Sequence, residues 1–218
     1  MVYRSHWQQR HELQYERFKF VREILEFIIA DEPYVFFDEM SVHSFMHTKK
    51  AWSYRDQPVV AVVNSGRRYS QTVYGAIGNI FKQPVMQFSG ITNSENCLKY
   101  FRFLKEETVK VTEKKLHIIL DNAPAHTAVK TGVKPFLEEN FFVHFMPKGT
   151  PQVNAIEHFW SSYKARIKKS LFSNPDMPLS ENLFRTKVEA VGNSYTAEEV
   201  QSLLRSSNTY MLDLLLKF

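Results

Sequence analysis

Three acidic residues stand where a carboxylate can do chemistry. Asp38 ends the apolar run YVFFD, Asp121 ends the run HIILD, and Glu157 lies near the start of a long amphipathic segment. Ligands in α/β folds collect outside the carboxyl ends of parallel strands, so an acid that ends a strand is well placed. If the two strands are neighbours, their carboxylates repel each other unless a cation lies between them. Magnesium suits such a site because it prefers hard oxygen ligands.

Three carboxylates of this kind could hold two Mg²⁺ ions. One ion would activate the attacking oxygen and the other would stabilise the leaving oxygen of a phosphodiester. Each acid also has a structural explanation. An aspartate at a strand end is often simply solvated, and a glutamate in the first turn of a helix interacts favourably with the helix dipole. The residue types alone do not choose between these explanations.

The elements that must position these acids follow from apolar periodicity. Phe18, Val21, Leu25 and Ile28 recur at helical spacing. Short β-branched and aromatic runs bounded by turn residues predict strands at 34–38, 59–65, 69–78, 84–88, 117–121 and 141–145. Helices are predicted after the capping-box pair Thr92 and Glu95, over 128–139, along the stripe 156–171 and from Thr196 onward.

The order of these elements predicts the fold class. Strands joined by hairpins, followed by strand and helix in alternation, imply an α/β fold with a mixed sheet and helices packed on it. Pro175 and Pro178 mark a break. We therefore expect one domain over 1–172, with an N-terminal helix, and a C-terminal helical extension over 173–218 that packs on the domain or on a partner.

Composition narrows the class of protein. The 218 residues carry a formal net charge of +5, which favours a polyanionic partner. The single cysteine, Cys97, excludes an intramolecular disulfide framework. The first residues are too polar for a secretory signal, and no apolar stretch is long enough to span a membrane. We expect a soluble intracellular protein with no membrane partner.

The motifs around the three acids are more specific. The sequence resembles the catalytic domain of the mariner-like (Tc/mariner) superfamily of cut-and-paste DNA transposases, on the segments FFDEM, DNAPAH and PKGTPQVNAIEHFW. The gap of 35 residues between Asp121 and Glu157 is typical of that family. The resemblance implies a ribonuclease H-like fold, with a mixed five-stranded sheet flanked by helices, in which Asp38, Asp121 and Glu157 hold two Mg²⁺ or Mn²⁺ ions. It also implies DNA cleavage at transposon ends, followed by transfer of the 3′-hydroxyl into target DNA.

The departures from the family pattern concern the rim of the site and the N-terminus. Ala155 stands where the family usually has proline, and Lys148 with Gly149 replaces a commoner aromatic and small pair. The helix-turn-helix modules of the family are missing ahead of the first matching helix. The chain is then an excised catalytic domain, a host-recruited descendant, or a protein whose DNA-end recognition comes from another subunit. The family acts as dimers on DNA, in the nucleus of eukaryotes or otherwise in the cytoplasm.

Other residues are candidates for supporting roles. Asn122 and Asn154 would hydrogen-bond the ligating carboxylates or cap turns. His126 would place a water or a phosphate, or would be structural. Trp160 lies on the apolar stripe and is expected in the core. The candidate DNA-binding residues are basic, although a charged helix face is often only solvated; they are Arg67, Arg68, Lys148, Lys164, Arg166, Lys168 and Lys169.

Two other functions remain open at this stage. A nuclease on the same fold would hydrolyse nucleic acid without joining strands. A recruited, non-catalytic DNA-binding or assembly protein would need no intact set of carboxylates.

Overall fold

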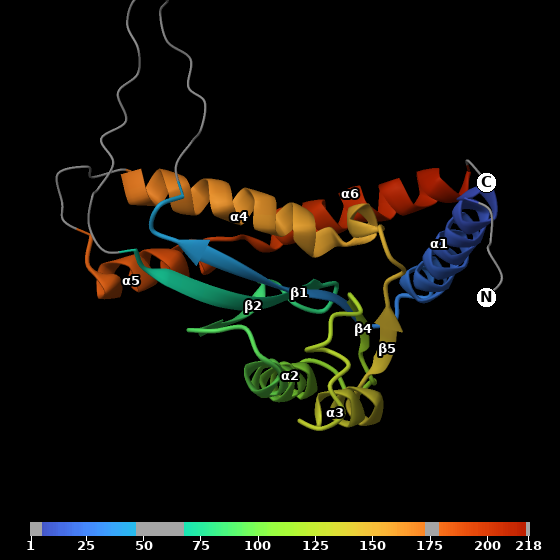
Figure 1. Cartoon of the computed structure of the whole chain (residues 1–218), viewed down its shortest axis with the longest axis horizontal. Coiled ribbons are helices and arrows are strands. Elements are labelled where there is room, and N and C mark those ends of the chain that lie inside the picture. Colours follow the sequence, from blue (N-terminus) through green and yellow to red (C-terminus); the bar gives the residue numbers. More distant parts are fainter. Residues whose placement is uncertain (1–5, 47–67, 173–178, 217–218) are drawn as a thin grey trace, which may run out of the picture.

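A mixed five-stranded sheet forms the centre of the molecule (Figure 1). The computed structural model describes residues 6–46, 68–172 and 179–216. The described elements are, in chain order, α1 (His6–Ile29), β1 (Tyr34–His43), β2 (Ser70–Gly78), β3 (Val85–Ser89), α2 (Ser94–Val109), β4 (His117–Leu120), α3 (Val133–Asn140), β5 (Phe142–Phe145), the 3₁₀ turn η1 (Pro151–Val153), α4 (Ala155–Phe172), α5 (Glu181–Gly192) and α6 (Ala197–Leu215).

The sheet has the strand order β3-β2-β1-β4-β5. The pairs β1–β2 and β2–β3 are antiparallel, whereas β1–β4 and β4–β5 are parallel. The antiparallel strands β2 and β3 are joined by the short segment 79–84, and the parallel half follows from the crossovers through α2 and α3. The predicted α/β class with a mixed five-stranded sheet is confirmed.

Helices cover both faces of the sheet. Side chains alternate along a strand, so Phe36 and Met40 of β1 pack in a core shared with α4, α5 and α6, while Val35 and Phe37 pack against α2 and α3. Figure 1 shows α4 and α6 on one side of the sheet and α2 and α3 on the other. Because both faces of β1 are buried, its first half reads as a continuous apolar run.

The predicted end of the first strand is wrong. Strand β1 does not stop at Asp38 but continues to His43, because β2 pairs with it along this length, from Val35 opposite Gly78 to His43 opposite Ser70. On its other side, β1 pairs only with the short strand β4, which ends at Leu120. Asp38 therefore lies inside a strand but beyond the end of its parallel neighbour.

Two predicted helix starts also differ from the structure. Asn93, not Thr92, is the N-cap of α2, and its side chain accepts a hydrogen bond from the backbone N–H of Asn96 at 2.8 Å. Helix α3 begins at Val133 rather than at 128, because Gly132 adopts a left-handed conformation with φ of +80°. The strand predicted at 59–65 lies outside the described residues.

The C-terminal helices pack on the sheet domain. Helix α6 begins with the predicted capping box between Thr196 and Glu199, and its residues Val200 and Met211 lie in the core that α4 also fills. The sequence reasoning did not identify α5, which packs against α4 through Phe184 and other apolar residues. The long predicted amphipathic helix is confirmed as α4.

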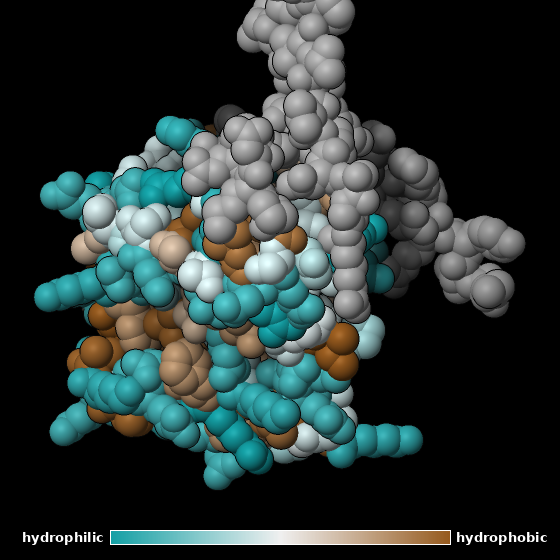
Figure 2. Space-filling view, turned by 90° about the vertical axis from the view of Figure 1, so that its left-hand side faces the viewer, coloured by the Kyte–Doolittle hydropathy of each residue, from teal (hydrophilic) through white to brown (hydrophobic). Residues whose placement is uncertain are grey.

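The outer surface is mixed in character. Hydrophilic side chains project between smaller apolar areas on the face seen in Figure 2. Within the described ranges, no helix is long and apolar enough to cross a membrane.

Candidate active site

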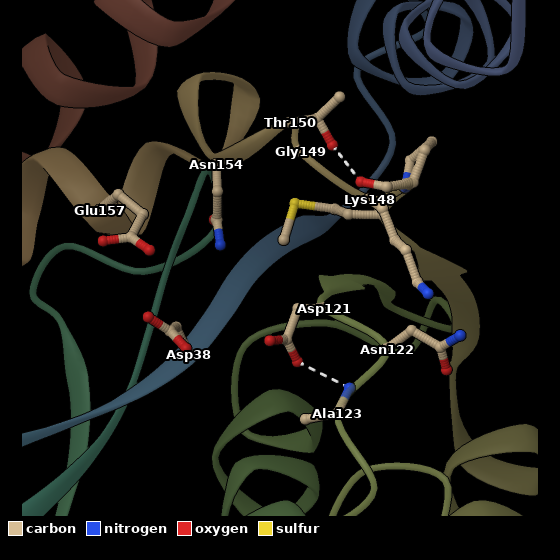
Figure 3. Close-up of a pocket in the computed structure, with 11 residues that line it drawn as sticks. Asp38, Asp121, Asn122, Ala123, Lys148, Gly149, Thr150, Asn154 and Glu157 are labelled. Atoms are coloured by element: carbon tan, nitrogen blue, oxygen red, sulfur yellow. Dashed lines mark hydrogen bonds between the residues drawn. The ribbon is translucent and has the colours of Figure 1, made fainter. Parts of the chain in front are cut away.

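One cleft of about 350 Å³ brings together the three predicted carboxylates. Figure 3 shows Asp38 on β1, Asp121 directly after β4 and Glu157 in the first turn of α4, arranged around this cleft. The other residues that line it come mainly from the segments after β4 and β5; they are Asn122, Ala123, Met146, Pro147, Lys148, Gly149, Thr150 and Asn154.

The sheet register explains why the two aspartates meet. In the parallel pair, Phe36 lies opposite Ile119. Extending this register by two residues puts Asp38 at the level of Asp121, although no strand pairing holds the two chains together at that point. The cleft thus opens where β4 ends and β1 continues, beside the carboxyl ends of the parallel strands.

Glu157 reaches the cleft from the other side because α4 starts there. The turn η1 precedes α4, and the backbone N–H of Glu157 donates to the carbonyl oxygen of Asn154 at 3.1 Å. Glu157 is exposed, while its neighbour Ile156 is buried under the sheet. Its place in the first turn also suits the helix dipole, so the position is compatible with both predicted roles.

Repulsion among the acids is visible at Asp38. The pKa of Asp38 is raised from 3.8 to about 7, first by burial and then by the neighbouring negative charges of Glu39, Glu157 and Asp121. A carboxyl held in this way gains from any cation placed between it and its neighbours. The electrostatics of the cleft therefore favour a bound cation.

Asn154 supplies a buried polar group to the same cleft. Its side chain is 3% exposed and points into the space between Asp38 and Glu157 (Figure 3). Its Oδ1 atom is buried and has no hydrogen-bond partner in the structure. Such an unpaired buried oxygen beside three carboxylates is expected to gain a partner when an ion, water or substrate enters the cleft.

The carboxylates do not form a finished metal site in this conformation. Among the described residues, no three His, Cys, Asp or Glu side chains lie close enough to hold one ion together. The donors that line the cleft are nevertheless carboxylate and amide oxygens, which are the ligands that Mg²⁺ and Mn²⁺ favour. The residues present fit divalent cations whose coordination is completed by water and phosphate oxygens.

Trp160 is a site residue that sequence reasoning assigned only to the core. It is buried, as predicted, but its indole N–H also donates a hydrogen bond to Oδ2 of Asp38 at 3.1 Å. Gly75, which pairs with Asp38 across the β1–β2 ladder, leaves room for the indole. A Cβ atom at position 75 would lie 2.5 Å from Cη2 of Trp160, so a larger residue would displace the ring.

We expect Trp160→Phe to remove the hydrogen bond that orients the Asp38 carboxylate while it keeps most of the core packing. The phenyl ring keeps most of the apolar contacts, but the hydrogen bond to a charged acceptor is lost, which costs about 1–2 kcal/mol of unfolding free energy. Urea unfolding at neutral pH measures this change. Phe159→Leu, in the adjacent core position, is the control for loss of aromatic volume alone. Equal activity of the two variants in a metal-dependent assay would contradict a role for the indole N–H at Asp38.

His126 does not line the cleft but contacts Asp121 from behind. The His126 side chain is 1% exposed. Its Nδ1 atom lies 2.7 Å from Oδ1 of Asp121, and its Nε2 atom lies 2.9 Å from Oε2 of Glu39. Burial alone would lower the pKa of His126, but its hydrogen bonds to Asp121, Cys97 and Glu39 raise it to about 12. The hydrogen bond from His126 lowers the pKa of Asp121. His126 is thus buried between two carboxylates, with neither ring nitrogen left to take a phosphate from the cleft.

The predicted DNA-binding residues fall in different places. Lys148 lines the cleft together with Asn122, and Figure 3 shows both on the side of the cleft away from Glu157. Lys164 and Lys168 are partly exposed on α4, Lys169 is exposed, and Arg68 is exposed just before β2. Arg67 lies outside the described residues. Arg166 forms an ion pair with Glu199 and covers the ring of Tyr195, so it fastens α4 to α6.

The rim that carries Lys148 is held by the N-terminal helix. Arg17 of α1 donates to the carbonyl oxygen of Lys148 at 3.3 Å. Gly149 has φ of +73°, and a Cβ atom there would lie 2.6 Å from Nη2 of Arg17. The left-handed backbone conformation therefore favours glycine here, and a Cβ atom would also displace the flexible end of the Arg17 side chain.

Comparison with known proteins supports the same family. The sequence model described as DDE superfamily endonuclease matches residues 33–177. No curated protein sequence matches the chain.

Solved structures with a similar fold include those of Mos1 mariner transposase. Mos1 transposase in a paired-end complex with the left transposon end has a TM-score of 0.70 at 16% identity, over 94% of this chain and 62% of that one. The Mos1 mariner paired end complex with Mn gives 0.62 at 18% identity, with coverages of 94% and 62%. The catalytic domain of Mos1 mariner transposase gives 0.59 at 16% identity, with coverages of 94% and 93%.

The lengths of these matches show which part of the Mos1 chain this chain resembles. It spans 62% of the length of the Mos1 chain in the paired-end complex, but 93% of the isolated catalytic domain. The family predicted from the motifs is confirmed. The chain belongs to the DDE superfamily of endonucleases and has the ribonuclease H-like fold of a mariner transposase catalytic domain.

Proposed function

We propose that this chain is the catalytic domain of a cut-and-paste DNA transposase. Asp38, Asp121 and Glu157 would hold two Mg²⁺ or Mn²⁺ ions in the cleft, cleave DNA at transposon ends and join the freed 3′-hydroxyl to target DNA. The observation that carries the proposal is the convergence of these three carboxylates on one cleft in a chain of the DDE superfamily. The Mos1 complexes with Mn and with a transposon end support the same metals and the same nucleic acid.

The protein groups would act mainly by position and charge. Bound divalent ions would supply a Lewis acid and lower the pKa of an attacking water or hydroxyl. Trp160 orients the Asp38 carboxylate, and the amide of Asn154 lies ready to hydrogen-bond what enters the cleft. Lys148, on the opposite rim, offers positive charge to a phosphate. Joining requires only that the 3′-oxygen bond to the target phosphorus while the target's own P–O3′ bond breaks, so little covalent work falls to the protein.

The remaining partners are part of the proposal. DNA recognition at the transposon ends would come from a further module or from another subunit, because the cleft itself offers few groups that read bases. Paired transposon ends call for at least two copies of the chain on the DNA. Two partly exposed lysines of α4, Lys164 and Lys168, lie on the same helix face as Glu157 and would follow the DNA backbone away from the cleft.

A joining assay separates transposase from nuclease. The protein is incubated with Mn²⁺, supercoiled plasmid and an excess of a labelled short duplex that ends in a 3′-hydroxyl. A transposase links the label covalently to plasmid DNA, and the product disappears with a 3′-deoxy end. Shortened or nicked DNA without joined label would indicate a nuclease, and no reaction on either DNA would contradict both activities.

A further inference from the structure

The side chains of His126 and Glu39 link the Asp121 carboxylate to the strand that carries Asp38. His126 lies between Glu39 and Asp121, with Nε2 2.9 Å from the Glu39 carboxylate and Nδ1 2.7 Å from the Asp121 carboxylate. The Nδ1 atom is also 3.1 Å from the backbone carbonyl oxygen of Asp121. The His126 side chain is 1% exposed and that of Glu39 is 15% exposed, so water competes little for these bonds.

The sheet makes this connection necessary. Glu39 follows Asp38 in β1, and its side chain emerges on the opposite face of the sheet. The last paired residues of β1 and β4 are Phe36 and Ile119, so no ladder hydrogen bonds hold the segment of Asp121 to β1. The Asp121 side chain is 54% exposed, and its other hydrogen bond comes from the nearby N–H of Ala123 at 3.0 Å. Among the hydrogen bonds of the described residues, those through His126 and Glu39 tie the Asp121 carboxylate to the strand that carries Asp38, and the His126 ring also packs edge-on against Phe37 of that strand.

We propose that Glu39 and His126 are positioning residues that fix the Asp121 carboxylate relative to Asp38 for divalent-cation binding. This inference rests on the proposed function of the cleft and adds two residues that would not touch the metal. Partners that orient metal ligands typically change metal affinity by about 10–100-fold when removed. Two features of the sequence point to these positioning residues: the acid directly after Asp38 and the histidine five positions after Asp121.

A second Glu–His pair, which does not line the cleft, serves as the control. His144 Nδ1 lies 2.7 Å from Oε1 of Glu23, and the His144 side chain is 10% exposed. This pair joins β5 to α1 and leads to His117, not to the cleft. Glu23 is 53% exposed, so loss of this Glu–His contact should cost less stability than loss of the Glu39–His126 contact, and it should leave metal binding unchanged.

Calorimetric titration with Mn²⁺ tests the proposal without relying on catalysis. Wild type is compared with Glu39→Ala, His126→Asn, Glu39→Gln, the control Glu23→Ala and the ligand variant Asp121→Ala, with circular dichroism and melting temperature recorded for each. Asparagine at 126 can place its amide nitrogen near Asp121 but cannot reach Glu39. Glutamine at 39 keeps the size and a hydrogen-bonding group beside the ring.

We expect Glu39→Ala and His126→Asn to weaken Mn²⁺ binding by about 10-fold or more. Glu39→Gln should restore most of the affinity, and Glu23→Ala should bind as wild type does. If Asp121→Ala loses Mn²⁺ while Glu39→Ala and a folded His126→Asn bind normally, the positioning role is overturned and the proposed function stands. If wild type and Asp121→Ala do not differ in Mn²⁺ binding, the proposed function of the cleft fails and this inference fails with it.

Discussion

Replacing Asp121 by asparagine, or Glu157 by glutamine, should lower the rate of Mn²⁺-dependent DNA cleavage by about 10³-fold or more, which corresponds to ~4 kcal/mol of transition-state stabilisation. The amides have nearly the same size as the acids they replace, so the fold is kept. They carry no negative charge, so each removes a hard anionic ligand from the cleft. Nicking of supercoiled plasmid under single-turnover conditions measures the effect.

A matched control separates metal binding from helix stabilisation at position 157. Glu198 is an exposed acid in the first turn of α6, as Glu157 is in the first turn of α4. Glu198→Gln removes a comparable interaction with a helix dipole, worth about 0.3–1 kcal/mol, and should leave cleavage unchanged. Wild-type cleavage by a folded Glu157→Gln protein would show that Glu157 serves only its helix.

Asp38→Asn should make the metal-free protein more stable at pH 8 while abolishing its activity. The pKa of Asp38 is raised from 3.8 to about 7 by burial and by the neighbouring acids, and each unit represents about 1.4 kcal/mol. Because this carboxyl is partly solvated, we expect a gain on the order of 2 kcal/mol rather than the full value. Urea unfolding in the presence of a chelator measures it.

The sign of the pH dependence follows from the direction of the shift. A carboxyl with a raised folded-state pKa contributes most stability below its unfolded value, and this contribution is lost as the pH rises through 7. The advantage of Asp38→Asn should therefore grow from pH 4 to pH 7 and level off above it. Saturating Mg²⁺ should reverse the order, because it stabilises the wild-type cleft alone. An advantage that is constant with pH would contradict charge repulsion as its cause.

The three acids were predictable because each follows a strong local pattern. Asp121 ends a short apolar strand, Glu157 starts an amphipathic helix, and both lie in motifs at a typical spacing. The convergence of Asp38 and Asp121 required only the parallel pairing of β1 with β4, whereas Glu157 also depends on where α4 begins. The end of β1 was missed because the length of a strand depends on its partner, and β2 continues to pair after Asp38.

The contacts of the residues that support the acids were not predictable, because these contacts join distant segments. Trp160 has the spacing of a core residue, and nothing in its local sequence shows that its N–H reaches Asp38, 122 positions earlier. Glu39 and His126 are separated by 87 positions and meet only once the sheet forms. Arg166 has the same charge as its neighbours on α4, but its partners Glu199 and Tyr195 come from the following C-terminal segment.

The most direct measurement is an anomalous-scattering experiment on crystals of the protein grown with Mn²⁺. Manganese peaks should lie in the cleft, between the carboxylates of Asp38 and Asp121 and between those of Asp38 and Glu157, at coordination distance from these oxygens. Crystals of Asp121→Ala grown in the same way should lose the first peak. Manganese bound elsewhere on the molecule, with the cleft empty in the wild type, would contradict the assignment of these three acids as metal ligands.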